Sequence, residues 1–196
     1  MSRRERRAKA KKSRHRRPGN TVRYVNKTSG MVALAAMTMG TAATGASAAD
    51  FDGAMVKDLN TRGQGSNPGS FMAASGRSFF VAEDPTSGDE LWTSDGTQAG
   101  TAMVKDIYPG PSSGLDYYGY GSNSDFALVG NTLYFAADDG VNGTELWKSD
   151  GTSAGTQLVK DIRPGSGTYG PNSSGVSDLT VVGTTVYFTA NDGTTG

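Results

Sequence analysis

Residues 90–101 read ELWTSDGTQAGT, and residues 145–156 read ELWKSDGTSAGT. The two stretches lie 55 positions apart and differ only where Thr93 is replaced by Lys148 and Gln98 by Ser153. Self-similarity at a fixed offset is the signature of a repeat architecture. The sequence therefore predicts a tandem array of one structural unit.

Two further elements recur around this motif. Val-Lys-Asp followed by Leu or Ile occurs at residues 56–59, 104–107 and 159–162, with offsets of 48 and 55. An aromatic pair also occurs three times, as Phe79-Phe80, Tyr134-Phe135 and Tyr187-Phe188. These elements predict about three repeat units within residues 55–196.

One unit can be divided into strands and turns over residues 126–162. Short apolar or β-branched runs at 126–129, 132–136, 144–148 and 156–162 are separated by segments rich in Gly, Asn and Asp. Alternation places Leu146 on one face of its strand, and Glu145 and Trp147 on the other. We expect an all-β fold of antiparallel four-stranded units, each with the size and strand count of a β-propeller blade.

A single blade cannot bury both of its faces, so it must stack on its neighbours. We therefore expect Trp92 and Trp147, with the aromatic pairs, to pack between units rather than form a ligand platform. Asp95 and Asp150 should accept hydrogen bonds from backbone N–H groups in a hairpin turn, with a metal role as the alternative. In the same turn, Gly151 and Gly155 are expected to tolerate positive φ.

The motif Glu-Leu-Trp-x-x-Asp-Gly-Thr, followed by Val-Lys-Asp-Ile-x-Pro-Gly, resembles the ELWxxDGT repeat family of bacterial secreted and surface proteins. The resemblance covers residues 51–196 and implies a propeller-like β array outside the cytoplasm. The family has no established catalytic residues, so the resemblance assigns none here.

The units differ in completeness. We divide them as 55–102 (partial), 103–157 (complete) and 158–196 (truncated), because the next Glu-Leu-Trp strand is due near position 198. A closed propeller takes about four blades or more. We therefore expect an incomplete, propeller-like fold from a fragment of a longer protein, with open strand edges that allow self-association.

Charge is divided between two parts of the chain. Residues 1–49 hold 12 basic residues and one acid, whereas residues 50–196 hold 7 basic residues and 18 acids, a net charge of 7 − 18 = −11. A basic segment, an apolar run at 31–39 and Ala-Ser-Ala at 46–48 form the pattern of a secretory signal peptide. We predict a signal peptide at 1–48 with a long, disordered basic region, cleavage after Ala48 or Ala49, and a short linker at 49–54.

A nucleic-acid-binding tail and a membrane anchor are the alternatives for this leader. The pattern does not distinguish Sec from twin-arginine export. If the leader is removed, the acidic remainder is not expected to bind nucleic acid, since phosphates repel it. Contact with the membrane is then expected only during export, and the mature protein is predicted to be secreted or at the cell surface.

Missing residue types exclude several chemistries. The chain has no Cys, and its only histidine is His15 in the leader. Residues 50–196 therefore lack Ser-His-Asp and Cys-His catalytic groups and zinc sites built on Cys or His. The remaining acids recur with the repeat, as turn residues do. We predict that the protein is not an enzyme and needs no cofactor.

Residues 115–120 interrupt the repeat and are rich in tyrosine. Tyr117, Tyr118 and Tyr120 are the candidate ligand-binding residues for an extracellular glycan or protein, because tyrosine offers contact area at low entropy cost. The alternative is that they fold back on the edge of a blade.

Several acids lie in or beside the loops between second and third strands. They are Asp138, Asp139 and Asp192, with Asp84 and the pair Asp89-Glu90. Oxygen-rich loops of this kind can hold calcium, although the spacing fits no standard calcium loop. Asp138, Asp139 and Asp192 are therefore weak calcium candidates, and solvated acidic turns are the main interpretation.

Together these features predict a secreted, non-catalytic β-repeat protein for extracellular interaction or adhesion. Two alternatives remain open. The repeats can be the binding module of a larger secreted hydrolase, or they can be a structural spacer.

Overall fold

The structure is a computed structural model that describes residues 31–32, 56–60, 65–115 and 126–195. Every regular element in these ranges is a β-strand. The prediction of an all-β fold is therefore confirmed for the described part of the chain.

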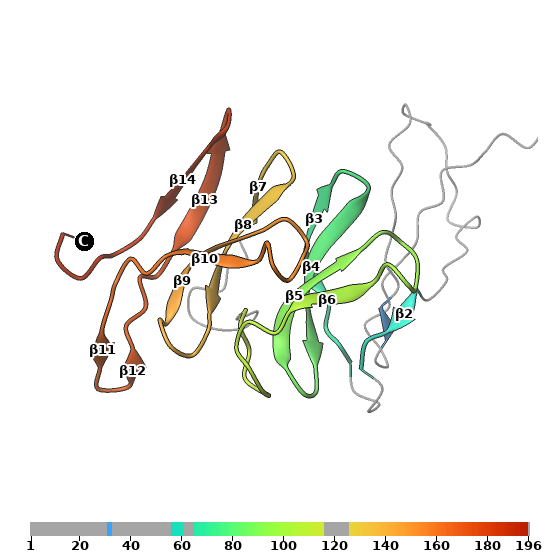
Figure 1. Cartoon of the computed structure of the whole chain (residues 1–196), viewed down its shortest axis with the longest axis horizontal. Coiled ribbons are helices and arrows are strands. Elements are labelled where there is room, and N and C mark those ends of the chain that lie inside the picture. The colour runs from blue at the N-terminus through green and yellow to red at the C-terminus, as the bar shows by residue number, and fades with distance from the viewer. Residues whose placement is uncertain (1–30, 33–55, 61–64, 116–125, 196) are drawn as a thin grey trace, which may run out of the picture.

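Two four-stranded antiparallel sheets form the centre of the molecule (Figure 1). The first has the order β3-β4-β5-β6, and the second β7-β8-β9-β10. The prediction of antiparallel four-stranded units is confirmed. The strands are β3 (Gly69–Ala74), β4 (Arg77–Asp84), β5 (Gly88–Ser94), β6 (Ala102–Lys105), β7 (Ala127–Val129), β8 (Thr132–Asp138), β9 (Thr144–Ser149) and β10 (Gln157–Lys160).

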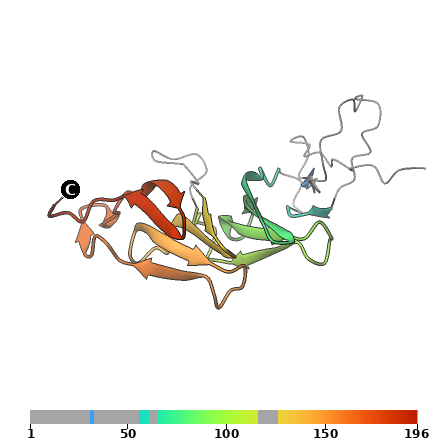
Figure 2. The same cartoon turned by 90° about the horizontal axis from the view of Figure 1, so that it is seen from above.

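The remaining strands form three two-stranded pairs. They are β1 (Met31–Val32) with β2 (Lys57–Asp58), β11 (Ser166–Gly167) with β12 (Gly170–Pro171), and β13 (Ser177–Val182) with β14 (Thr185–Thr189). The larger sheets follow one another in chain order, as Figures 1 and 2 show from two directions. The described residues show separate sheets and no closed barrel or propeller. The propeller-like arrangement therefore stays a prediction.

The two large sheets share one register, which explains the sequence repeat. Phe80 on β4 lies opposite Trp92 on β5, and Phe135 on β8 lies opposite Trp147 on β9. Each pair is displaced from the other by the 55 positions that separate the sequence motifs. The first sheet takes its last strand, β6, from residues 102–105.

Both faces of each large sheet are apolar. Successive side chains of a strand point to opposite faces, and successive residues here are apolar. One face of the first sheet packs against the second sheet in a single buried cluster. The other face packs against the segment around β2. The first cluster includes Phe79, Val81, Leu91, Phe135, Ala137 and Trp147; the second consists of Val56, Leu59, Phe80, Ala82 and Trp92.

A lysine joins successive units at equivalent positions. Lys57 donates through Nζ to the carbonyl oxygen of Thr101 at 2.7 Å, and Lys105 donates to that of Thr156 at 3.1 Å. The Lys105 ammonium also lies 5.5 Å from the centre of the Trp147 ring, within the range of a cation–π contact. The Lys of Val-Lys-Asp therefore contacts the turn of the unit that follows it.

The Ser-Asp-Gly-Thr turns have the same hydrogen bonds in both sheets. Asp150 Oδ1 accepts from Thr152 N at 2.8 Å and from Thr152 Oγ1 at 2.7 Å, and Thr152 Oγ1 accepts from Gly155 N at 3.0 Å. Asp95 forms the equivalent bonds with Thr97. These aspartates thus hold the hairpin between the third and fourth strands.

The two glycines of this turn are needed for different reasons. Gly151 has a φ of +88°, which favours glycine, whereas Gly155 is outside the left-handed region. The expectation of positive φ at Gly155 is therefore wrong. A Cβ at this position would instead overlap the carboxylate of Asp150. Gly155 is required because the side chain of Asp150 folds against its backbone.

We expect Gly155→Ala to lower the free energy of unfolding by about 1–3 kcal/mol, because the added methyl group displaces the Asp150 carboxylate from the turn. Urea denaturation followed by tryptophan fluorescence measures this change. Gly65→Ala is the control, since its Cβ would meet nothing nearer than Asn67 Oδ1 at 3.4 Å. Equal stability of the two variants would contradict this account of the turn.

Candidate functional site

A repeated backbone hydrogen bond shows where the units differ in length. The N–H of Glu83 donates to Ser66 O at 2.8 Å, that of Asp138 to Gly114 O at 2.9 Å, and that of Asn191 to Ser174 O at 2.8 Å. Ser66, Gly114 and Ser174 are therefore equivalent positions in the three units. Each precedes the first strand of its unit.

The second unit has an insertion directly after this bond. The pairing of first and second strands makes Phe71, Phe126 and Leu179 equivalent, because Met72, Ala127 and Thr180, which follow them, lie opposite Phe79, Tyr134 and Tyr187. Phe71 and Leu179 lie five positions after Ser66 and Ser174, whereas Phe126 lies twelve positions after Gly114. The difference, 12 − 5 = 7, is a seven-residue insertion.

The predicted ligand-binding residues Tyr117, Tyr118 and Tyr120 fall within this insertion and lie outside the described residues. Its two neighbours are described, and both are buried in the cluster between the large sheets. Leu115 is 3% exposed and Phe126 is 9% exposed. The backbone N–H of Leu115 also donates to Asp89 O at 3.0 Å. Both ends of the inserted segment are thus fixed to the sheets.

The glutamate of each Glu-Leu-Trp motif is fully buried. Glu90 accepts from the backbone N–H groups of Ile107 at 3.1 Å, Tyr108 at 3.2 Å and Gly114 at 3.0 Å. These donors come from the segment between β6 and the insertion. The carboxylate therefore holds the chain that leads into the inserted segment.

Glu145 repeats this arrangement in the second sheet. It accepts from Ile162 N at 3.0 Å and from Ser174 N at 3.1 Å, and it is also fully buried. The sequence analysis placed Glu90 in or beside the loop between the second and third strands, and it lies near the start of β5. The available signal was alternation, since Glu90 and Glu145 stand two positions from a buried tryptophan in a strand.

Burial raises the pKa of Glu90 to about 8. The N–H groups of Ile107, Tyr108 and Gly114 act in the opposite direction and lower it, while the nearby negative charge of Asp106 raises it further. The folded protein therefore holds a proton on Glu90 at pH values where the unfolded chain has lost it.

The calcium candidates bond to their own turns. Asp138 Oδ1 accepts from Gly140 N at 2.7 Å. Asp139 accepts from Val141 N at 2.9 Å, and from Asn142 through its backbone and its side-chain amide, both at 2.8 Å. Asp192 accepts from Thr194 N at 2.8 Å and from Thr195 N at 2.7 Å. Their oxygens thus contact backbone donors.

These bonds also set the charge of the turns. Partial burial raises the pKa of Asp139, but the N–H groups of Asn142 and Val141 outweigh it and hold the pKa below its ordinary value. The Thr195 hydroxyl and backbone N–H lower the pKa of Asp192. Within residues 31–32, 56–60, 65–115 and 126–195, no three His, Cys, Asp or Glu side chains are grouped so that they could hold a metal ion.

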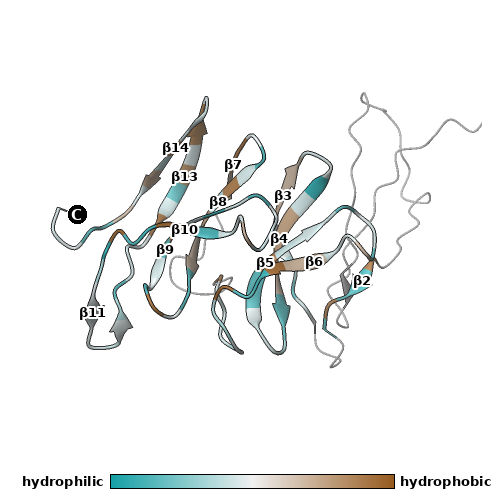
Figure 3. Cartoon of the chain, viewed as in Figure 1, coloured by the Kyte–Doolittle hydropathy of each residue, from teal (hydrophilic) through white to brown (hydrophobic). Residues whose placement is uncertain are grey.

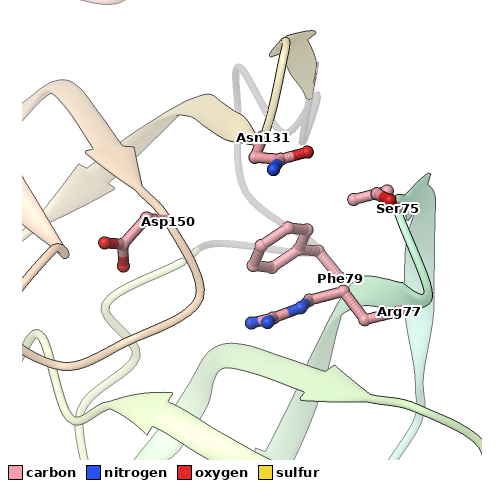
Figure 4. Close-up of a pocket in the computed structure, with 6 residues that line it drawn as sticks. Ser75, Arg77, Phe79, Asn131 and Asp150 are labelled. Carbon is pink, nitrogen blue, oxygen red and sulfur yellow. The ribbon is translucent and has the colours of Figure 1, made fainter.

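A pocket of about 210 Å³ lies where the first sheet meets the turns of the second. Figure 4 shows the Arg77 guanidinium extending from β4 toward the turn that carries Asp150, with the Phe79 ring beside it. The Thr152 hydroxyl and N–H lower the pKa of Asp150, and the charge of Arg77 lowers it further. Ser75 and Asn131 complete the polar lining.

Sequence reasoning did not identify this pocket. Arg77 has no equivalent arginine in the other units, and the pocket brings Arg77 and Asp150 together although they are 73 positions apart in the sequence. The pocket has one cation and one carboxylate, and its described lining has no general base paired with a nucleophile. It can accept a small polar group, but its lining gives no evidence for a particular reaction.

The described residues form no helix that is long and apolar enough to cross a membrane. No protein-family model, curated protein or solved structure matches the chain. The resemblance to the ELWxxDGT repeats, and the function and location it implies, therefore stay predictions.

The raised pKa of Glu90 predicts a pH-dependent stability. Between its ordinary pKa of 4.5 and about 8, folded Glu90 is protonated while unfolded Glu90 is ionised. Unfolding then releases a proton, so rising pH favours the unfolded state. We expect the free energy of unfolding to fall across this window, by at most about 1.4 kcal/mol per pH unit.

Denaturation at a series of pH values in wild type, Glu90→Gln and Glu83→Gln tests this. Glu90→Gln should remove this component of the slope, and Glu83→Gln, which changes a less buried glutamate, should keep it. Parallel pH profiles for wild type and Glu90→Gln would show that Glu90 is not the group responsible.

Proposed function

We propose that this protein is a secreted or cell-surface repeat scaffold that presents an inserted tyrosine-rich segment to an extracellular glycan or protein, without catalysis of its own. The observation that carries the proposal is the seven-residue insertion between Gly114 and Phe126. In the other two units the equivalent positions are five apart rather than twelve, so the unit itself does not need the inserted segment.

The attachment of this segment supports a role in binding. Leu115 and Phe126 are buried at its two ends, and the Glu90 carboxylate holds the backbone at Gly114. Fixed ends reduce the entropy that a loop loses when it binds a partner. Tyrosine in such a segment supplies contact area with few rotatable bonds.

The acids support a structural rather than a chemical role. Asp95, Asp150, Asp139 and Asp192 accept hydrogen bonds from turn residues, and Glu90 and Glu145 accept from buried backbone donors. The same bonds recur from unit to unit. A catalytic pair would need at least one carboxyl group at a position that the repeat does not occupy.

Replacing Tyr117, Tyr118 and Tyr120 together by alanine should abolish binding and leave stability within about 0.5 kcal/mol of wild type, since the proposal makes them contact residues for the partner rather than for the sheets. Sedimentation with insoluble polysaccharides (cellulose, chitin, xylan and peptidoglycan) and a glycan array measure binding. Tyr169→Ala, which removes a fully exposed tyrosine between β11 and β12, is the matched control.

The Asp138→Asn variant, measured in the same assays, shows whether the ligand is bound by the tyrosines or by the acidic turns. The proposal requires that this variant bind as wild type does. Retained binding in the triple tyrosine variant, or loss of binding in Asp138→Asn alone, would contradict it.

A further inference from the structure

We propose that the pocket beside Arg77 binds a single neutral sugar ring. This inference is independent of the tyrosine segment, because the pocket and the junction at Gly114 lie at opposite ends of β8. Asn131 lines the pocket directly before the first residue of β8, whereas Gly114 bonds to Asp138, the last residue of that strand. The ends of a strand of this length are roughly 20 Å apart.

Arg77 is a side chain that the repeat itself does not need. It begins β4, and the equivalent residues at the start of β8 and β14 are Thr132 and Thr185. The arginine is also exposed. A long cationic side chain therefore stands where a short neutral one is sufficient for the strand. A departure from the repeat at an exposed position indicates a role that the other units do not share.

The guanidinium of Arg77 is held in place but has no polar partner. In the part of the chain that the structure describes, it forms no hydrogen bond and no ion pair. It lies against the backbone of Gly151, where a Cβ would overlap its Nη1 atom. The pKa values of Asp95 and Asp150 are lowered first by the threonines of their own turns and further by the charge of Arg77. Its N–H groups are thus available to a ligand.

The charges around the pocket favour a neutral ligand. Arg77 lies near Asp95 and Asp150, so the group has a net charge of 1 − 2 = −1. An anion at the guanidinium would be repelled by two carboxylates, and a cation in the pocket would be repelled by the guanidinium. A neutral polar group avoids both repulsions and still accepts charge-assisted hydrogen bonds from Arg77.

The lining matches the hydroxyl groups and the C–H surface of a sugar ring. Arg77 and the Asn131 amide supply donors, and the Asn131 carbonyl and the Ser75 hydroxyl supply acceptors (Figure 4). Ala74 and the ring of Phe79 supply apolar surface. Each sugar hydroxyl both donates and accepts, so it can use this mixed set. The volume of about 210 Å³ is below the roughly 300–1,000 Å³ of pockets for drug-sized ligands, which suits one ring.

Three hairpin turns hold this lining in position before a ligand arrives. The turn between β3 and β4 is closed by the pairing of Ala74 with Arg77, and the turn between β7 and β8 by that of Val129 with Thr132. The third turn, between β9 and β10, is fixed by the bonds from Thr152 to Asp150 described above. A preformed site loses little entropy when it binds.

Amide NMR spectra of the isotope-labelled chain, titrated with D-glucose, D-galactose, D-mannose and N-acetyl-D-glucosamine, test the site. We expect at least one sugar to shift the signals of residues 75–77, 131–132 and 150–152 to saturation. The usual free energy per ligand atom puts the dissociation constant of a single ring in the millimolar range. The methyl glycoside of that sugar identifies the source. Equal binding indicates the terminal ring of a glycan, loss of binding indicates a free monosaccharide, and both support a sugar-ring site.

The Arg77→Thr variant, which carries the residue found in the other units, should raise the dissociation constant at least about tenfold because it removes charge-assisted bonds. Arg163→Thr removes an arginine outside the pocket and should leave the constant unchanged. The dispersion of the NMR spectrum shows whether each variant is folded. The triple tyrosine variant should bind the sugar as wild type does, since its changes lie outside the pocket. Millimolar binding is lost in the sedimentation and array assays, so the two proposals can fail separately.

The proposal is wrong if none of the four sugars shifts the signals of the pocket, or if Arg77→Thr binds the sugar as tightly as wild type. Sodium acetate and sodium phosphate serve as charged probes. Stronger shifts of the same signals with either anion would also overturn the proposal, because they would identify an anion site.

Discussion

The two-sided apolar character of each sheet is the constraint on which this structure depends. Phe79 and Phe80 point to opposite faces of β4, and both are fully buried. Burying a phenylalanine side chain contributes roughly 1.5–3 kcal/mol, so neither face can remain in water without a substantial loss. Each sheet consequently needs a neighbour before it and a neighbour after it, and the chain provides them in sequence order. The segment around β2 covers the first sheet, the first sheet covers the second, and β13 follows.

Much of this arrangement could be predicted from the sequence. The alternation in residues 144–148 and the glycine-rich turns gave the strand order of a unit, because these signals are local. The prediction of four-stranded antiparallel sheets followed from the same signals and agrees with the structure. The prediction of positive φ at Gly155 was wrong. Glycine is needed there because the Asp150 side chain, five residues earlier, lies against its backbone, and not because of its own backbone angle.

The features that could not be predicted depend on contacts between distant residues. Alternation places Glu145 on the same strand face as Trp147. Only the folded chain shows that the N–H groups of Ile107 and Ile162 reach the carboxyl groups of Glu90 and Glu145. The pocket at Arg77 likewise joins two sheets. The sequence showed the insertion as a break in the repeat, but its length of seven residues required the equivalence of Ser66, Gly114 and Ser174 in the structure. Tyr117, Tyr118 and Tyr120 remain predicted contact residues.

The junction at Gly114 has a consequence for how such a chain can change. The hydrogen bond from Asp138 N to Gly114 O closes the unit on one side, and the burial of Phe126 closes it on the other. The fold accepts a separation of either five or twelve positions between these two points, with the same strand register on both sides. Loop-closure entropy grows only slowly with length, so further residues here cost little. The junction is therefore a natural place to graft foreign peptides for display, and a place where related chains can diversify their recognition segments while the sheets stay the same.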